Sequence, residues 1–250
     1  MSVRAWIGVA AVVLFAAVAG LATWWFVGSA EEAVDQQAAE DLASEIDGGA
    51  ATGDVIVPAE ASDEPITDVN GTWTVTGQDP DAVSDGSFVG YRINEILSGV
   101  ANTVTGRTAD VTGEITIRND QLVAGAFEVQ MASIATDQSQ RDSQMRDRGY
   151  AYGTFPTSTF VVSEPVAVDA EIALAEQVQT IPVVGELSLH GVTRAVTIDL
   201  SASLVGSTLA VTGSVDITLA DWDIDKPTGF RVADVDDVGV LELQLFFSLD

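Results

Sequence analysis

Residues 181–200, with the sequence IPVVGELSLHGVTRAVTIDL, constrain the fold more than any other stretch of the chain. The large apolar residues occupy odd positions before His190-Gly191 and even positions after it. A period of two on both sides predicts two β-strands, each with one buried face. If the chain folds back at His190-Gly191, one register brings every large apolar side chain to the same face. That register pairs Leu189 with Val192, Val183 with Ile198, and Ile181 with Leu200.

The turn between these two strands is short. Gly191 supplies the positive φ that a two-residue turn requires. A four-residue loop centred on the same point keeps the same register, so both loops stay open at this stage. In either case the segment is an antiparallel hairpin with one apolar face, which further structure has to cover.

The same alternation recurs along the chain and predicts an all-β, antiparallel domain. Further strands are expected at residues 71–76, 87–93, 103–108, 110–118, 122–133, 157–162, 207–219 and 238–249. Residues 137–149 break the alternation and predict a polar helix, with Asp137 as N-cap and Gly149 at its C-terminal end. Successive strands with one apolar face must close into a barrel or stack into a sandwich, and the pattern alone does not choose between the two.

Two sequence blocks resemble the YceI-like family. Residues 185–196, GELSLHGVTRAV, are similar to the family hallmark G-x-L-T-I-x-G-V-T-R-P-V. Residues 141–160 are similar to the family segment R-D-x-H-L-R … F … P … F, with Gln144 in place of its His and with Tyr150 and Tyr152 among the residues that replace Phe. The resemblance spans residues 71–250. It implies an eight-stranded antiparallel β-barrel, lipocalin-like, with one interrupting α-helix, and relatives that bind polyisoprenoids and other long apolar chains.

The composition excludes several classes of function. The chain has 38 acidic and 10 basic residues, a formal net charge of −28, and no cysteine. A surface this acidic repels nucleic acid phosphates and anionic lipid headgroups. Without cysteine there is no disulfide framework and no thiolate metal or redox site. The charge is consistent with plain solubility and with life in high salt, where carboxylate repulsion is screened.

The N-terminal segment predicts a membrane anchor within residues 1–30. The run from Ala5 to Val27 carries no charge, and it spans about 34 Å as a helix, enough to cross a bilayer core of about 30 Å. Arg4 precedes the run and Glu31 follows it, which places the N-terminus in the cytoplasm and the remaining chain outside. The alternative is a signal peptide cleaved near Ala30, although the run exceeds the usual length of roughly 7–15 residues. Either alternative exports the domain, as a single-pass cell-membrane protein or as a secreted or periplasmic one.

Residues 31–69 predict an acidic, largely disordered linker. This stretch contains no Lys or Arg. Val34, Ala38, Leu42 and Ile46 recur every four residues and favour a short helix in its first half. From Gly48 onward, small residues and prolines are typical of a disordered tether. The predicted organisation is therefore an anchor at 1–30, this linker at 31–69 and a barrel domain at 70–250, with the barrel held roughly 35 Å from the anchor.

No catalytic or metal site is predicted. His190, the sole histidine, lies at the hairpin tip, where an exposed turn residue is the expected role. No nucleophile motif accompanies it. Asp221, Asp223 and Asp225 resemble the first ligand positions of a calcium loop, but Lys226 stands where that loop needs Gly, so the match fails. An enzyme is the weakest hypothesis, and no cofactor is expected beyond a bound isoprenoid lipid.

The apolar interior is the predicted binding site. Alternation alone is equally typical of a packed core, and the family resemblance favours a ligand cavity. Gly125, Gly185 and Gly213 fall on the apolar register and predict room for a chain. The residues expected to contact an elongated apolar lipid are Phe88, Ile115, Ile117, Phe127, Val129, Met131, Phe160, Leu187, Leu189, Val211, Val215, Leu243 and Leu245, with Tyr150, Tyr152 and Phe155 near an entrance.

The partners predicted are a membrane, through the run from Ala5 to Val27, and an apolar lipid, with no nucleic acid. Arg141, Arg146 and Arg148 form the one basic cluster of the domain and are candidates for a lipid headgroup. Their alternative role is to fix the helix over a barrel end. A packed barrel that displays its acidic surface to a cell-envelope partner is the alternative function, and the oligomeric state stays open, a dimer included.

Overall fold

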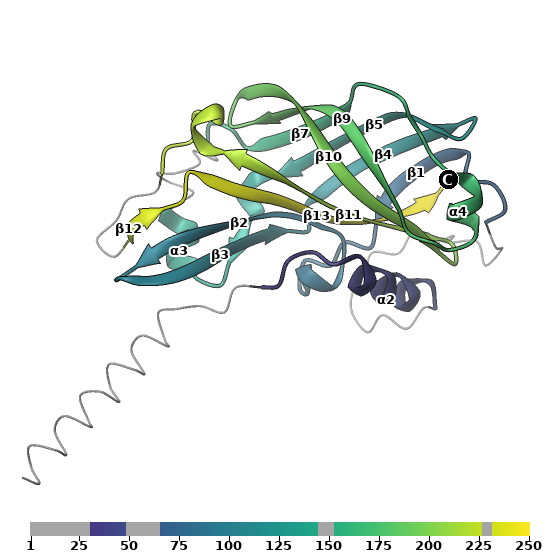
Figure 1. Ribbon diagram of the computed structural model, residues 1–250. Helices are drawn as coiled ribbons and strands as arrows, with labels where there is room; N and C mark the ends of the chain where they lie inside the picture. The colour runs from purple at the N-terminus through teal and green to yellow at the C-terminus, as the bar shows by residue number, and fades with distance from the viewer. Residues whose placement is uncertain (1–30, 49–65, 145–152, 227–231) are drawn as a thin grey trace, which may run out of the picture.

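The computed structural model describes residues 31–48, 66–144, 153–226 and 232–250, and its centre is a closed antiparallel barrel (Figure 1). Eight strands form the ring, and the last pairs with the first. This confirms the all-β, eight-stranded, lipocalin-like barrel. In ring order the strands are β1 (Gly71–Thr76), β4 (Val111–Arg118), β5 (Gln121–Gln130), β7 (Thr157–Val162), β9 (Gln179–Leu189), β10 (Val192–Val205), β11 (Thr208–Thr218) and β13 (Val238–Leu249).

The long strand β13 has two partners along one edge. Residues 246–249 pair with β1 and close the ring, whereas residues 240–244 pair with β2 (Phe88–Leu97). β2 and its partner β3 (Val100–Thr108) therefore continue the sheet beyond the ring (Figure 1). Three short strands complete the sheet: β6 (Ala135–Thr136) on β3, β8 (Val166–Ala167) on β5 and β12 (Val232–Val235) on β2.

The hairpin that the sequence predicts is β9–β10, and its register is confirmed. Leu189 pairs with Val192, and the predicted pairs further along the ladder are also present. His190 has a φ of 51° and Gly191 a φ of 79°. Both turn residues are thus in the left-handed region, as a two-residue type I′ turn requires, and the four-residue loop is excluded.

Helix α2 (Gln36–Asp47) confirms the short helix expected in the first half of residues 31–69, and its docking corrects the expectation of a free tether there. Asp35 caps the helix by accepting a hydrogen bond from the backbone N–H of Ala38. Ala39 and Ala43 are 0% exposed and pack against Phe246 on the outside of the barrel. Alanine at both positions lets the helix lie close to the sheet, so this half of the predicted linker is docked. The anchor at 1–30 and the linker residues 49–65 lie outside the described residues.

Two short α-helices interrupt the barrel strands. α3 (Ser139–Gln144) corresponds to the predicted polar helix but begins two residues later, and residues 145–149 of that prediction lie outside the described residues. α4 (Ala170–Leu174) was not predicted, although Asp169 provides an N-cap by accepting from two backbone N–H groups. Across the described ranges, no helix combines the length and the hydrophobicity needed to span a bilayer.

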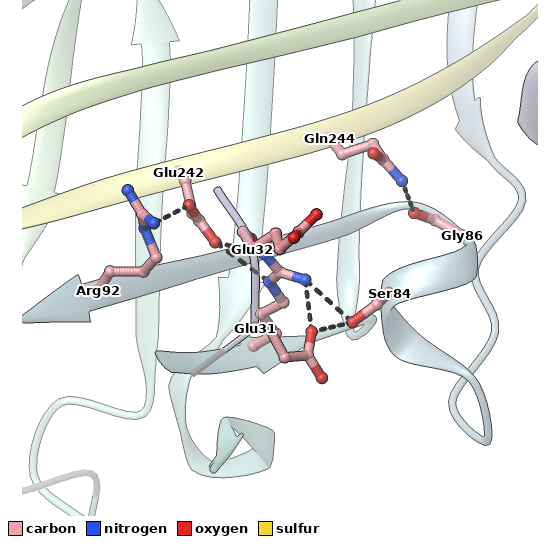
Figure 2. A network of polar contacts seen from close by, with 8 residues as sticks. Glu31, Glu32, Ser84, Gly86, Arg92, Glu242 and Gln244 are labelled. Carbon is pink, nitrogen blue, oxygen red and sulfur yellow. Dashed lines mark hydrogen bonds and ion pairs between the residues drawn. The ribbon is translucent and has the colours of Figure 1, made fainter. Parts of the chain in front are cut away.

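The outer face of β13 carries a buried ion-pair network (Figure 2). The carboxylate of Glu242 is 1% exposed, and Nε and Nη2 of Arg107 donate to its Oε1 at 3.1 and 2.8 Å. Nε of Arg92 lies 3.1 Å from Oε2. The guanidinium carbon of Arg107 also lies 4.3 Å from the ring centroid of Phe88. Two guanidinium groups thus pair with one buried carboxylate. This pairing offsets the cost of removing the carboxylate from water.

The glycines on the apolar register do not leave room for a ligand, which corrects the sequence-based expectation. A Cβ at Gly185 would lie 2.3 Å from Cζ of Phe160. At Gly213 it would lie 2.5 Å from Cδ2 of Leu200, and at Gly125 2.8 Å from a methyl group of Val162. Side chains from neighbouring strands therefore already fill the space, and each glycine permits close packing within the wall.

Substituting Gly185 with alanine is expected to destabilise the barrel by about 1–3 kcal/mol, because the new methyl group overpacks the wall. That methyl group would also lie 2.7 Å from the carbonyl oxygen of Val161, which cannot rotate away. Urea unfolding with an unchanged m-value measures the effect. Gly153→Ala is the matched control, since its Cβ meets nothing within 4 Å. Equal stabilities of the two variants would contradict the close packing.

Candidate functional site

The barrel encloses an apolar cavity. The volume of the cavity is about 170 Å³, and every strand of the ring contributes residues to its lining. An apolar cavity of about 150 Å³ holds a molecule the size of benzene, so this cavity has room for about six methylene-sized groups. This volume accommodates a short segment of one hydrocarbon chain.

Most of the predicted binding residues line this cavity. They come from strands on all sides of the ring, and their alternation brings them to one continuous inner surface. They are Ile115, Ile117, Phe127, Val129, Met131, Phe160, Leu187, Leu189, Val211, Val215, Leu243 and Leu245.

Phe88 does not line the cavity, and its predicted inward position is wrong. Phe88 pairs with Gln244 of β13, and its ring lies under the guanidinium of Arg107 on the outer face. Its neighbours Val89 and Tyr91 line the cavity. The first residues of β2 are apolar at consecutive positions because both faces of the strand are covered, so the alternation did not show which residue points inward.

The predicted entrance is only partly described. Phe155 is half-buried, with its ring centroid 4.5 Å from that of His190, and it is not among the lining residues. It packs over the tip of the β9–β10 hairpin, where it contacts the turn at Gly191. Tyr150 and Tyr152 lie outside the described residues.

Several lining residues were not among the predicted contacts. Trp73 and Phe247 are almost fully buried and line the cavity, and both continue the apolar alternation of their strands. The alternation in these two strands therefore predicts that both residues point into the barrel. Val69 and Ala173 also line the cavity, and Val69 is held in place because its carbonyl accepts a hydrogen bond from Nε1 of Trp73 at 2.9 Å. No sequence period points to these two, because they lie outside the ring strands.

The few polar side chains among the lining residues include groups already bonded to protein. Oγ of Ser158 donates to the carbonyl of Ser188 at 2.8 Å. Gln179 exchanges hydrogen bonds with the backbone of Asp169, at 3.0 and 3.3 Å. Oγ of Ser203 accepts from Gln36 at 2.9 Å. Glu242 also borders the cavity, and its carboxylate is paired with Arg92 and Arg107. These groups are engaged, so the cavity offers a ligand apolar contact rather than charge pairing.

Arg141 has protein partners at α3. Its Nη1 lies 2.6 Å from Asp137, and its Nη2 lies 3.3 Å from the buried Glu95. Asp142 accepts from the backbone N–H and the hydroxyl of Thr136, which ties α3 to β6. This pairing favours the alternative in which the arginine fixes the helix. Arg146 and Arg148 lie outside the described residues.

His190 is half-buried, which corrects its expected exposure. Its Nδ1 lies 3.1 Å from the carbonyl oxygen of Trp222, and Phe155 covers its ring. Its role there is to join the hairpin tip to the turn at Trp222. Within the described residues, no three His, Asp or Glu side chains are grouped in a way that could hold a metal ion.

Comparisons with known proteins agree with this geometry. The sequence model of the family described as the YceI-like domain matches residues 66–247. A polyisoprenoid binding domain from Saccharophagus degradans, implicated in plant cell wall breakdown, has 17% identity and a TM-score of 0.51, over 72% of this chain and 99% of that one. BcnA of Burkholderia cenocepacia has 18% identity and a TM-score of 0.51, over 67% of this chain and 99% of that one. A search of curated proteins finds no match.

Proposed function

The chain belongs to the YceI-like domain family, and from this membership we propose that it holds an elongated apolar lipid inside its barrel, a polyisoprenoid being the favoured class. The observation that carries the proposal is the apolar cavity of about 170 Å³. The structural relative from Saccharophagus degradans, which is described as a polyisoprenoid binding domain, supports the ligand class.

The energetics of the cavity favour a hydrocarbon chain. Burial of about six methylene-sized groups contributes about 5 kcal/mol, at about 0.8 kcal/mol each, before the costs of ordering the ligand. Such a chain needs no hydrogen-bond partner inside the barrel. A polar headgroup therefore stays outside the cavity, and the role that we propose is binding rather than catalysis.

We also propose that the run from Ala5 to Val27 anchors the protein in the cell membrane, with the barrel on the extracytoplasmic side. The uncharged length of the run and the placement of Arg4 before it support this proposal. The membrane is then the source of the lipid. If the segment is cleaved as a signal peptide, the barrel is released as a secreted or periplasmic protein.

The test of the proposed function is mass spectrometry of an organic extract. The full chain is expressed with export, purified, and extracted beside the Val129→Trp variant, whose barrel is expected to be obstructed. Lipid that surrounds the anchor appears in both extracts. The difference between the two extracts therefore measures the lipid bound inside the barrel. We expect about one isoprenoid or fatty chain per wild-type molecule in that difference. Identical extracts, also after incubation with isoprenoid-containing vesicles, would contradict the proposal.

The filled glycine positions in the barrel wall favour a second candidate. Phe160 covers Gly185 and Leu200 covers Gly213, as in a wall built for packing. In this alternative the barrel is an interaction domain of the cell envelope, and the net charge of −28 attracts a basic partner. Identical extracts in the experiment above would favour this candidate.

A further inference from the structure

The chain that immediately follows the proposed anchor is fixed to the barrel. We call residues 31–47 the strap. Nη1 of Arg107 forms an ion pair with Glu31 at 2.5 Å, and its Nη2 donates to the carbonyl of Glu32 at 2.5 Å (Figure 2). Ser84 contributes a hydroxyl that bonds both Arg107 and Glu31. Because Arg92 and Arg107 carry one more charge than Glu242, the carboxylate of Glu31 completes the charge balance of the network.

The strap is also held along its length and at its end. Gln36 exchanges hydrogen bonds with Ser203 and Thr212, at 2.9 and 2.7 Å. At the far end of α2, Asp47 accepts from the backbone N–H and the hydroxyl of Ser207, at 2.8 and 2.7 Å. Together with the buried alanines of α2, these contacts make the strap part of the barrel surface rather than a tether.

This attachment limits the distance between barrel and membrane. Val27 precedes Glu31 by four residues, and four extended residues span at most about 14 Å. Residues 49–65 of the predicted tether follow α2 in the chain, between the strap and β1. They do not separate the anchor from the barrel, so the membrane surface lies within about 14 Å of the strap's start.

An apolar hairpin tip lies within reach of that surface. The tip joins β2 to β3 at residues 96–101, where Ile96 is 38% and Val100 39% exposed and no residue carries a charge. Val100 and Arg107 are seven residues apart on β3, which corresponds to about 23 Å along the strand. This length exceeds the roughly 14 Å that the chain between anchor and strap can span, so the tip reaches the membrane when β3 is directed toward it.

Asp234, Asp236 and Asp237 lie on and beside β12, next to the tip, and Lys226 and Asn94 are their partners. Asp234 of β12 lies opposite Ile96 in the sheet. Lys226 lies 3.8 Å from Asp234 and 2.5 Å from Asp237. A zwitterionic surface carries no net charge that would repel these carboxylates, so a short apolar tip can enter the boundary between headgroups and acyl chains.

We propose that the strap holds the barrel directly on the membrane and that the β2–β3 tip inserts into the outer leaflet beside the anchor. This inference rests on the proposed anchor. It identifies the partner of the tip as a lipid surface, and it places the barrel where an apolar chain can pass from the bilayer without crossing bulk water.

The test uses a probe whose emission shifts to the blue in an apolar environment. Because the chain contains no cysteine, Ser98→Cys in the full chain gives a single attachment site at the tip. The protein is reconstituted into phosphatidylcholine vesicles. We expect a blue shift at residue 98, and none for the control Val178→Cys, which is 47% exposed beside α4 at the other end of the barrel (Figure 1).

Strap variants separate this inference from the anchor. Glu31→Lys places like charges together at Arg107, and Ala43→Arg forces α2 off the sheet. Combined, they are expected to abolish the blue shift at residue 98 while flotation with vesicles continues. A blue shift that survives in the combined variant would overturn the role of the strap. If the wild-type protein floats with the vesicles but the probe at residue 98 shows no blue shift, insertion of the tip is overturned. Failure to float would overturn the anchor itself, and the inference with it.

Discussion

Replacing Val129 with tryptophan is expected to remove bound lipid from the barrel while the fold is retained. Val129 is buried in β5 and its side chain lines the cavity. The larger indole displaces roughly three or four ligand carbons, and at about 0.8 kcal/mol per methylene the affinity falls by about 2–3 kcal/mol, or roughly 50-fold. Titration with a fluorescent isoprenoid measures the affinity. Leu243→Trp, from β13, is expected to act in the same way.

The matched control is Val161→Trp in β7. Val161 is 47% exposed on the outside of the barrel, so the same change leaves the cavity untouched. Its affinity is expected to equal that of the wild type. If both valine variants bind as the wild type does, the ligand lies elsewhere and the cavity is not the site.

Replacing Arg107 with alanine is expected to lower the free energy of unfolding by about 3–5 kcal/mol, because a buried carboxylate loses its closest partner. Glu242 would keep only the ion pair with Arg92, whose side chain is more exposed. The contact with the ring of Phe88 is also lost. Urea unfolding measures the change as a lower midpoint.

Two further variants define the source of that loss. Arg194→Ala removes an arginine whose pair with Asp221, at 3.8 Å, is exposed, and it is expected to cost about 1 kcal/mol or less. Combining Arg107→Met with Glu242→Leu removes the buried carboxylate as well, so much of the stability is expected to return. A double variant as unstable as Arg107→Ala would show that packing, and not the unpaired charge, dominates the loss.

The sequence predicted the barrel wall well because one buried face imposes alternation on every strand. β1, β7 and β13 agree with their predicted bounds residue for residue, and the β9–β10 register follows from the apolar positions alone. The same alternation located most of the cavity lining. These features follow from which side of each strand is buried, and burial determines the spacing of apolar residues along the chain. They can therefore be predicted from one sequence.

The features that were missed depend on contacts between distant segments. Docking of α2 depends on Ala39 meeting Phe246, far along the chain, and an acidic helix gives no sign of such a partner. The outer face at Phe88 is covered by Arg107 of β3, and this contact made the orientation of Phe88 ambiguous in the sequence. The filled space at Gly185 likewise depends on Phe160 from another strand.

Closure of the ring through β1 and β13 determines when the protein can fold. Thr74 donates a hydrogen bond to Asp250 at 2.9 Å, and these residues are 176 positions apart. The barrel therefore stays open, with unpaired strand edges, until synthesis reaches the last strand. Pairings of such long range form slowly, since the entropy of closing the loop is lost before the contacts stabilise it. This late closure is compatible with the export that we propose, in which the chain crosses the membrane unfolded and folds on the far side.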